Sequence, residues 1–217
     1  MDFHKFQFIY CVNDEQQFQN SWNHVYALNI PPGYTVDKSI IKNAGSITKG
    51  YNQAMLGSNA KYKLYLHQDV NILERNFLYL ILALFKKNPN LGMLGVLGAK
   101  RLPSNGVWWE TAESYGKCLY FDQICNCNTE VINEYESVQG IDGMIMITQY
   151  DIKWREDLFT GWHFYDLSQS LEFIKAGYTV GVPKQNVPWC AHNCLSSMLP
   201  FQISQQKFIQ EYQAFFK

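Results

Sequence analysis

Residues 62–70, YKLYLHQDV, predict a β-strand that ends in three polar side chains. Alternation of Tyr62, Leu64 and Leu66 with their neighbours is typical of a strand. His67 and Asp69 are two positions apart, so both project from one face and could meet one bound group. Asp69 could equally cap the following turn, as Asp often does after a strand.

Strands and helices are predicted to alternate on both sides of this stretch. The predicted strands are residues 5–12, 25–30, 62–66, 91–97, 143–148 and 178–182, and the predicted helices pass through Phe18 and Trp22 and cover residues 46–56, 77–87, 164–176 and 205–216. Residues 103–139 read as loops and short antiparallel strands. We therefore expect an α/β fold: a single, mostly parallel central sheet flanked by helices, with ligands bound beyond the carboxyl ends of its strands.

Length and composition favour one domain without broad electrostatic specialisation. The chain has 217 residues, with 18 Lys plus Arg against 19 Asp plus Glu, which gives no general reason to expect nucleic acid. The N-terminus lacks a secretory pattern, and the longest apolar run, residues 77–85, is too short for a transmembrane segment. We expect a cytoplasmic protein whose six cysteines remain thiols.

Two later segments contain further candidate ligands and bases. In residues 188–194, PWCAHNC, the residues Cys190, His192 and Cys194 alternate, and Cys125 with Cys127 could complete a zinc site. These spacings are not those of structural zinc, so zinc is disfavoured. His192 is instead expected to bind a divalent ion alone, or to be a hydrogen-bonded core histidine.

Residues 154–166, WREDLFTGWHFYD, form the densest polar and aromatic segment. His163 and Asp166 are three apart, so at the start of a helix they would share one side, with Asp166 as a base and His163 as its partner. Ordinary capping of the helix by acidic residues is the structural alternative.

Several motifs, taken in chain order, resemble those of a family-2-type glycosyltransferase with the GT-A nucleotide-sugar fold, in the branch that includes streptomycin-biosynthesis-type domains. Residues 8–15, FIYCVNDE, are similar to the family's opening strand and turn, and residues 43–52, NAGSITKGYN, to its second nucleotide-facing stretch. The resemblance implies that Asn13, Asp14, Gly45 and Asn52 bind the nucleotide. Residues 66–70 fall where the family carries its Asp-x-Asp metal motif.

At that motif, His67 stands in place of the first acid. The resemblance implies that His67 and Gln68 face the nucleotide, and that Asp69 and His192 hold Mn²⁺ or Mg²⁺ against the diphosphate. Mg²⁺ favours oxygen ligands, whereas Mn²⁺ tolerates an imidazole better.

The acceptor side is implied by the later motifs. Residues 141–144, IDGM, resemble the turn before the acceptor site, and residues 161–168 occupy the place of the family's Glu-Asp motif, with His163 over the first acid and Asp166 as the catalytic candidate. Asp142, Trp108, Trp109 and Trp162 are the expected acceptor or sugar contacts, although tryptophans in a loop can equally pack inward as an apolar plug.

The resulting hypothesis is a hexosyltransferase-like enzyme of polysaccharide biosynthesis. It would move a sugar from a nucleotide-diphosphate donor to a carbohydrate or other hydroxyl acceptor, and UDP-sugars are the favoured donors. The transfer would invert the anomeric centre and be assisted by a metal ion. Residues 1–102 would form a nucleotide-binding half and residues 103–217 an acceptor and catalytic half of one domain. A noncatalytic nucleotide- or carbohydrate-binding protein is the main alternative. A sugar nucleotidyltransferase is disfavoured because the first loop lacks a Gly-rich phosphate cradle.

Overall fold

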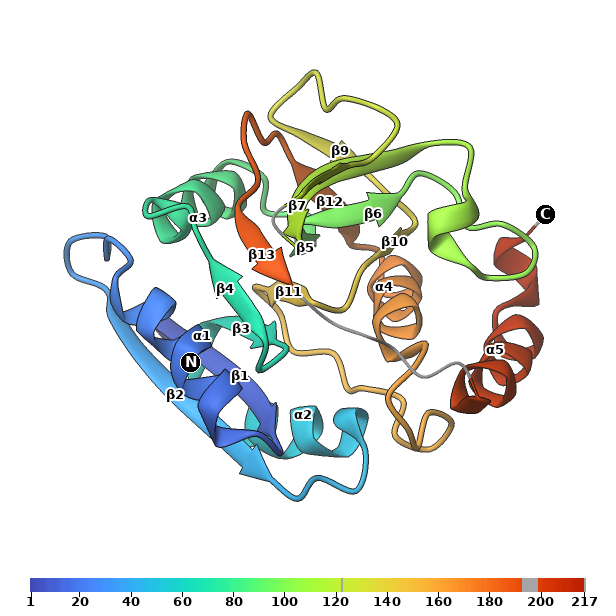
Figure 1. Cartoon of the computed structure of the whole chain (residues 1–217), viewed down its shortest axis with the longest axis horizontal. Coiled ribbons are helices and arrows are strands. Elements are labelled where there is room, and N and C mark those ends of the chain that lie inside the picture. The colour runs from blue at the N-terminus through green and yellow to red at the C-terminus, as the bar shows by residue number, and fades with distance from the viewer. Residues whose placement is uncertain (122, 193–198, 217) are drawn as a thin grey trace.

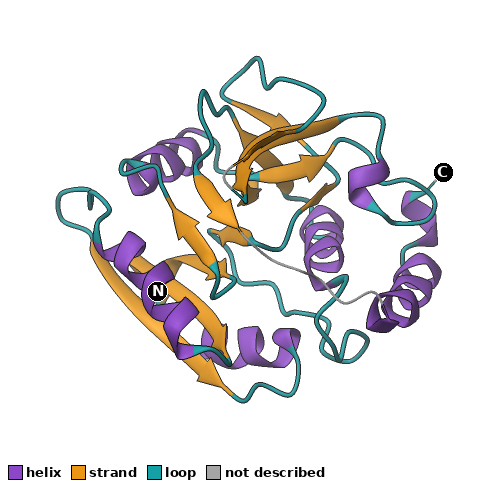
Figure 2. Ribbon diagram, in the orientation of Figure 1, coloured by secondary structure: helices purple, strands orange, loops and turns teal. Residues whose placement is uncertain are grey.

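The computed structural model describes residues 1–121, 123–192 and 199–216, which form a seven-stranded central sheet with helices around it (Figures 1 and 2). The strand order is β2-β1-β3-β11-β5-β12-β9. The strands are β1 (Asp2–Val12), β2 (Thr35–Lys42), β3 (Ala60–Leu66), β5 (Leu91–Gly95), β9 (Tyr135–Ser137), β11 (Ile145–Thr148) and β12 (Thr179–Pro183). Alternate residues of β1 enter two cores: Phe8 lies in one and Ile9 in the other.

Local sequence signals explain where the helices begin and end. Asp14 caps α1 by accepting from the backbone N–H groups of Gln16 and Gln17, and Ser46 caps α2 through the N–H of Lys49. The apolar side of α3 is buried, and the helix ends at Lys87, two residues before Pro89. The helices are α1 (Glu15–Tyr26), α2 (Ile47–Leu56), α3 (Phe77–Lys87), α4 (Tyr165–Lys175) and α5 (Leu199–Glu211), with short 3-10 helices η1 (Trp108–Glu110) and η2 (Gln213–Phe215).

A second sheet, of six strands, lies over one end of the first (Figure 1). It contains β4 (Val70–Ile72), β6 (Leu97–Ala99), β7 (Ser114–Tyr120), β8 (Gln123–Asn126), β10 (Gly140–Ile141) and β13 (Cys190–His192). The antiparallel pair β13–β4 places His192 opposite Val70. This register brings the late part of the chain next to the residue that follows Asp69.

The α/β class is confirmed, but three sequence predictions were wrong. The central sheet is mixed, because β11 runs antiparallel to both β3 and β5. Residues 25–30 are not a strand: α1 continues to Tyr26, and the strand follows the turn at Gly33, whose φ is +78°. The last helix begins at Leu199 and ends at Glu211, earlier than predicted. No helix within the described residues is long and apolar enough to cross a membrane.

Candidate active site

The polar residues after β3 are tied to the end of β1. The side-chain oxygen of Gln68 accepts from the backbone N–H groups of Asn13, at 2.9 Å, and Asp14, at 3.0 Å. Its amide nitrogen donates to the side-chain oxygen of Asn13. Because β1 and β3 pair in parallel, their carboxyl ends meet at one edge of the sheet. Gln68 therefore fixes the shape of that edge.

His67, Asp69 and His192 come together at this edge. One ligand atom from each lies within 4.8 Å of the other two. Nε2 of His192 is 3.2 Å from a carboxylate oxygen of Asp69, and the rings of His67 and His192 are 5.4 Å apart between centroids. The side chains of His192 and Asp69 are only 12% and 21% exposed. The structure thus assembles the two expected metal ligands, Asp69 and His192, and adds His67.

The electrostatics of this cluster suit a divalent transition-metal ion. Burial and the neighbouring His192 lower the pKa of His67 to about 4, so its imidazole is neutral at pH 7 and keeps a lone pair. Burial acts to raise the pKa of Asp69, but the hydrogen bond and electrostatic influence of the imidazoles outweigh it and lower that pKa. One carboxylate and two imidazoles fit Mn²⁺ better than Mg²⁺, which prefers oxygen.

A buried tyrosine joins His67 to helix α4. Tyr165 is the first residue of α4 and 3% exposed, and its hydroxyl forms a hydrogen bond with Nε2 of His67. The backbone N–H of His67 also donates to the carbonyl of Met144, at 3.1 Å. The residue before the helix, Phe164, is in the left-handed region with φ +60°. The end of β3, the turn before β11 and the start of α4 therefore meet at one point.

Asp166, the next residue of α4, faces the same turn. One carboxylate oxygen accepts from the backbone N–H of Gly143 at 3.0 Å and the other from that of Leu167 at 2.9 Å. Burial, reinforced by the nearby charge of Asp142, raises the pKa of Asp166 to about 7. Asp142 itself accepts from the N–H of Met144 at 2.8 Å. A carboxylate with a pKa near neutrality is well suited to accept a proton.

His163 does not share the helix with Asp166 as predicted. It precedes α4, and its ring packs on Phe201 of α5, with centroids 5.6 Å apart. The left-handed Phe164 between His163 and the helix changes the chain direction, so the three-residue spacing of a helix does not apply. The predicted placement of His163 on the same helical side as Asp166 is therefore wrong, while its role as a partner of Asp166 stays a prediction.

The expected nucleotide ligands lie in different surroundings. Asn13 follows β1, and Gly45 is exposed in the loop before α2, where no atom lies within 4 Å of the position of a Cβ. Asp14 caps α1 with one of its oxygens. Asn52 is buried, and its amide bonds both to the carbonyl of Trp154 at 3.0 Å and to its N–H at 2.9 Å. Asn52 thus holds the loop at Trp154 with one donor and one acceptor of its amide, and its contact with a nucleotide stays a prediction.

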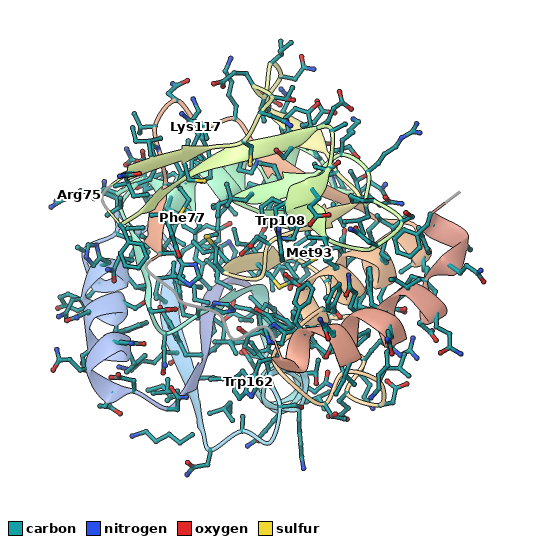
Figure 3. All side chains as sticks on the ribbon, turned by 45° about the vertical axis from the view of Figure 1, so that its right-hand side comes forward. Arg75, Phe77, Met93, Trp108, Lys117 and Trp162 are labelled. Atoms are coloured by element: carbon teal, nitrogen blue, oxygen red, sulfur yellow. The ribbon has the colours of Figure 1, made fainter. Side chains whose placement is uncertain are left out.

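The three tryptophans divide into one core residue and two surface residues. Trp108 is 8% exposed and belongs to the apolar core, so its ring is not available to stack on a sugar. For Trp108, the alternative of inward packing therefore applies. Trp109 and Trp162 are 54% and 49% exposed. Trp109 rests on Phe201, with centroids 5.8 Å apart. Figure 3 shows Trp162 in the lower part of the view, away from Trp108.

Two residues that sequence reasoning missed, Tyr165 and Gly143, hold the site together. A Cβ on Gly143 would lie 2.1 Å from the hydroxyl of Tyr165 and 3.1 Å from the Cβ of Asp166. Only glycine allows the turn, Tyr165 and Asp166 to approach so closely. The IDGM motif signalled a turn, but nothing in the sequence linked it to Tyr165.

The cysteines form no metal cluster among the described residues. His67, Asp69 and His192 are the only group of potential ligands in residues 1–121, 123–192 and 199–216, and it contains no thiol. The buried sulfurs of Cys118 and Cys190 lie 3.8 Å apart, and Cys125 is exposed. Cys194, part of the zinc alternative, lies outside the described residues.

Comparison with solved structures gives the class of the fold. Staphylococcus aureus TarS superposes with a TM-score of 0.58 at 12% identity, over 88% of this chain and 37% of that one. A Pyrobaculum calidifontis mannosyltransferase, PcManGT, in complex with GDP-Man and Mn²⁺ gives 0.57 at 10% identity, over 89% and 57%. TarS 1-349 with UDP-GlcNAc gives 0.52 at 13% identity, over 89% and 59%. The fold is thus that of the GT-A glycosyltransferases, and the chain spans less than two thirds of each of these structures.

The family follows from the sequence itself. Residues 7–212 match the glycosyltransferase-like family, and the chain belongs to that family. No curated protein matches the sequence significantly.

Proposed function

We propose that the chain transfers a sugar from a nucleotide-diphosphate donor, with UDP-sugars favoured, to a hydroxyl of a carbohydrate or similar acceptor, by one inverting displacement. The observation that carries the proposal is the connection of the His67–Asp69–His192 cluster to Asp166 through adjacent Tyr165. Family membership supports this reading, as does the presence of UDP-GlcNAc in one similar structure and of GDP-Man with Mn²⁺ in another.

On the donor side, His67, Asp69 and His192 would hold Mn²⁺, or less favourably Mg²⁺. When bound, the ion would neutralise the charge that develops on the leaving diphosphate. Asn13, Asp14, Gly45 and Gln68 line the strand ends and the adjoining loop where a nucleotide would lie, and Gln68 keeps the first loop in place for it. These residues belong to the proposed nucleotide-binding half, residues 1–102, and His192 joins them from the proposed acceptor half, residues 103–217.

On the acceptor side, Asp166 would accept the proton of the attacking hydroxyl. As the acceptor oxygen bonds to the anomeric carbon, the bond from that carbon to the diphosphate breaks, and the diphosphate departs with the electron pair. Attack from the face opposite the leaving group inverts the anomeric centre. Burial, reinforced by the charge of Asp142, keeps the pKa of Asp166 raised. The exposed rings of Trp109 and Trp162 offer apolar faces for a sugar.

Donor turnover tests the proposal. Wild-type chain is incubated with a panel of UDP-, GDP- and dTDP-sugars plus Mn²⁺, and release of the nucleoside diphosphate is measured. Asp69→Asn should reduce turnover at least 100-fold, because it removes the only carboxylate of the cluster. Asp37→Asn is the matched control, since Asp37 lies on edge strand β2 in an ion pair with Lys5. Binding of a donor without any turnover by the wild type would instead favour the noncatalytic alternative.

A further inference from the structure

The environment of Tyr165 is unusual because its one polar atom is directed at His67. The side chain is buried against Tyr51 and Trp154, with ring centroids 6.1 and 6.2 Å away. Its hydroxyl bonds to Nε2 of His67. Gly143 underlies this contact, since any side chain there would occupy the position of the hydroxyl.

The bond to Tyr165 determines which nitrogen of His67 can serve as a ligand. A neutral imidazole has one N–H and one lone pair. Because Nε2 is engaged by Tyr165, Nδ1 is the nitrogen left for an ion, and it has a lone pair only when Nε2 carries the proton. The oxygen of Tyr165 must then accept that N–H. Hydrogen bonds of this kind fix the tautomer and orientation of metal-binding histidines in other proteins.

We propose that Tyr165 is a positioning residue for the ion: it holds His67 in the tautomer and orientation that let an imidazole replace the first acid of an Asp-x-Asp motif. The proposal rests on the proposed function for the identity of the site. It also explains why the residue before Asp166 is a tyrosine. The first turn of α4 then contains the proposed base, Asp166, and the residue that orients the proposed ion ligand, His67.

The test measures Mn²⁺ affinity without donor, from the electron paramagnetic resonance signal of free Mn²⁺. Tyr165→Phe keeps the ring and removes the hydroxyl, and should raise the Kd for Mn²⁺ about 10- to 100-fold. Tyr51→Phe is the matched control: this hydroxyl is equally buried, and it has no hydrogen-bond partner within the described part of the chain. Its Kd should stay within about twofold of wild type. Circular dichroism and thermal unfolding without Mn²⁺ confirm that both variants fold.

The same substitution made in a His67→Ala variant distinguishes an effect of Tyr165 through His67 from a general effect on packing. If Tyr165 acts through His67, then Tyr165→Phe added to His67→Ala should change the Mn²⁺ Kd by less than about twofold. Equal losses in both backgrounds, or a loss in Tyr165→Phe no larger than in Tyr51→Phe, would overturn the proposal. So would a wild-type chain that binds no Mn²⁺, even if it transfers sugar. A chain that binds Mn²⁺ and shows the expected coupling but turns over no donor would refute only the proposed function.

Discussion

Replacing Asp166 with Asn should strongly reduce sugar transfer while leaving the fold at least as stable at pH 8. The substitution preserves shape and keeps a side-chain oxygen for the N–H of Gly143, but the N–H of Leu167 loses its acceptor and the group that accepts the proton is removed. Loss of a general base typically costs about 10² to 10⁴ in rate. We therefore expect kcat to fall by at least about 100-fold, with little change in KM for the donor.

The raised pKa of Asp166 gives the expected pH dependence. With a pKa of about 7, about one tenth of the folded chains carry the carboxylate at pH 6 and about nine tenths at pH 8. Wild-type kcat/KM should therefore rise about tenfold between these values and level off above pH 8. Asp142→Asn should move this rise to lower pH, because the charge of Asp142 contributes to the raised pKa of Asp166.

Stability should change with pH in the opposite direction. A carboxyl group whose pKa is higher in the folded chain binds more protons when folded, so the contribution of Asp166 to stability falls as pH rises from about 4 to about 7. At about 1.4 kcal/mol per pKa unit, the rise from 3.8 to about 7 sets an upper limit of about 4 kcal/mol. Asp166→Asn cannot ionise, so its free energy of unfolding should lack this decline.

The assays are initial rates from pH 5.5 to 9 at saturating Mn²⁺ and urea unfolding at pH 5 and 8. Asp37→Asn serves again as the control and should follow the wild-type rate profile. Two results would refute the reasoning: an Asp166→Asn enzyme that retains more than a tenth of wild-type kcat, or a wild-type profile that is flat across pH 7.

Two further predictions concern the ion and the sugar. His67→Asp restores an acid and should shift the ratio of Mn²⁺ to Mg²⁺ affinity toward Mg²⁺ by about tenfold or more, measured by titration calorimetry; an unchanged ratio would place His67 outside the coordination sphere. Trp162→Ala should raise the acceptor KM several-fold with a melting temperature close to wild type. Trp108→Ala should instead cost about 3–5 kcal/mol of stability. Equal losses of stability in the two variants would contradict the different burial of the two side chains.

Much of the fold was predictable because its signals are local. The apolar run of α3, followed by two lysines and then Pro89, gave both helix ends correctly. The prediction of a strand over residues 25–30 was wrong for a related reason. Val25 and Leu28 are both buried, and apolar residues at this spacing suit the end of a helix as well as an apolar strand. The antiparallel direction of β11 could not be predicted, since strand direction is set by pairing with β3 and β5.

In the candidate site, too, local features could be predicted and contacts between distant segments could not. Asp69 was a candidate because it follows a predicted strand and falls at the place of the family's metal motif, but the position of His192 beside it depends on the β13–β4 register, which joins segments far apart in the chain. Residue type and spacing did not show that Asn52 bonds to Trp154 or that His163 lies before α4 against Phe201, because both contacts join segments brought together by the fold.

The start of α4 departs from ordinary local rules, and the site explains why. A left-handed conformation costs a residue such as Phe164 about 1 kcal/mol or more, so surrounding contacts must enforce it. Its ring packs against Phe201 and Phe208 of α5, with centroids 4.8 and 5.1 Å away. This bend lets Tyr165 and Asp166 both face the glycine turn. His67 and Tyr165, 98 positions apart, are then best understood as a matched pair: the imidazole that replaces an acid requires the hydroxyl that orients it.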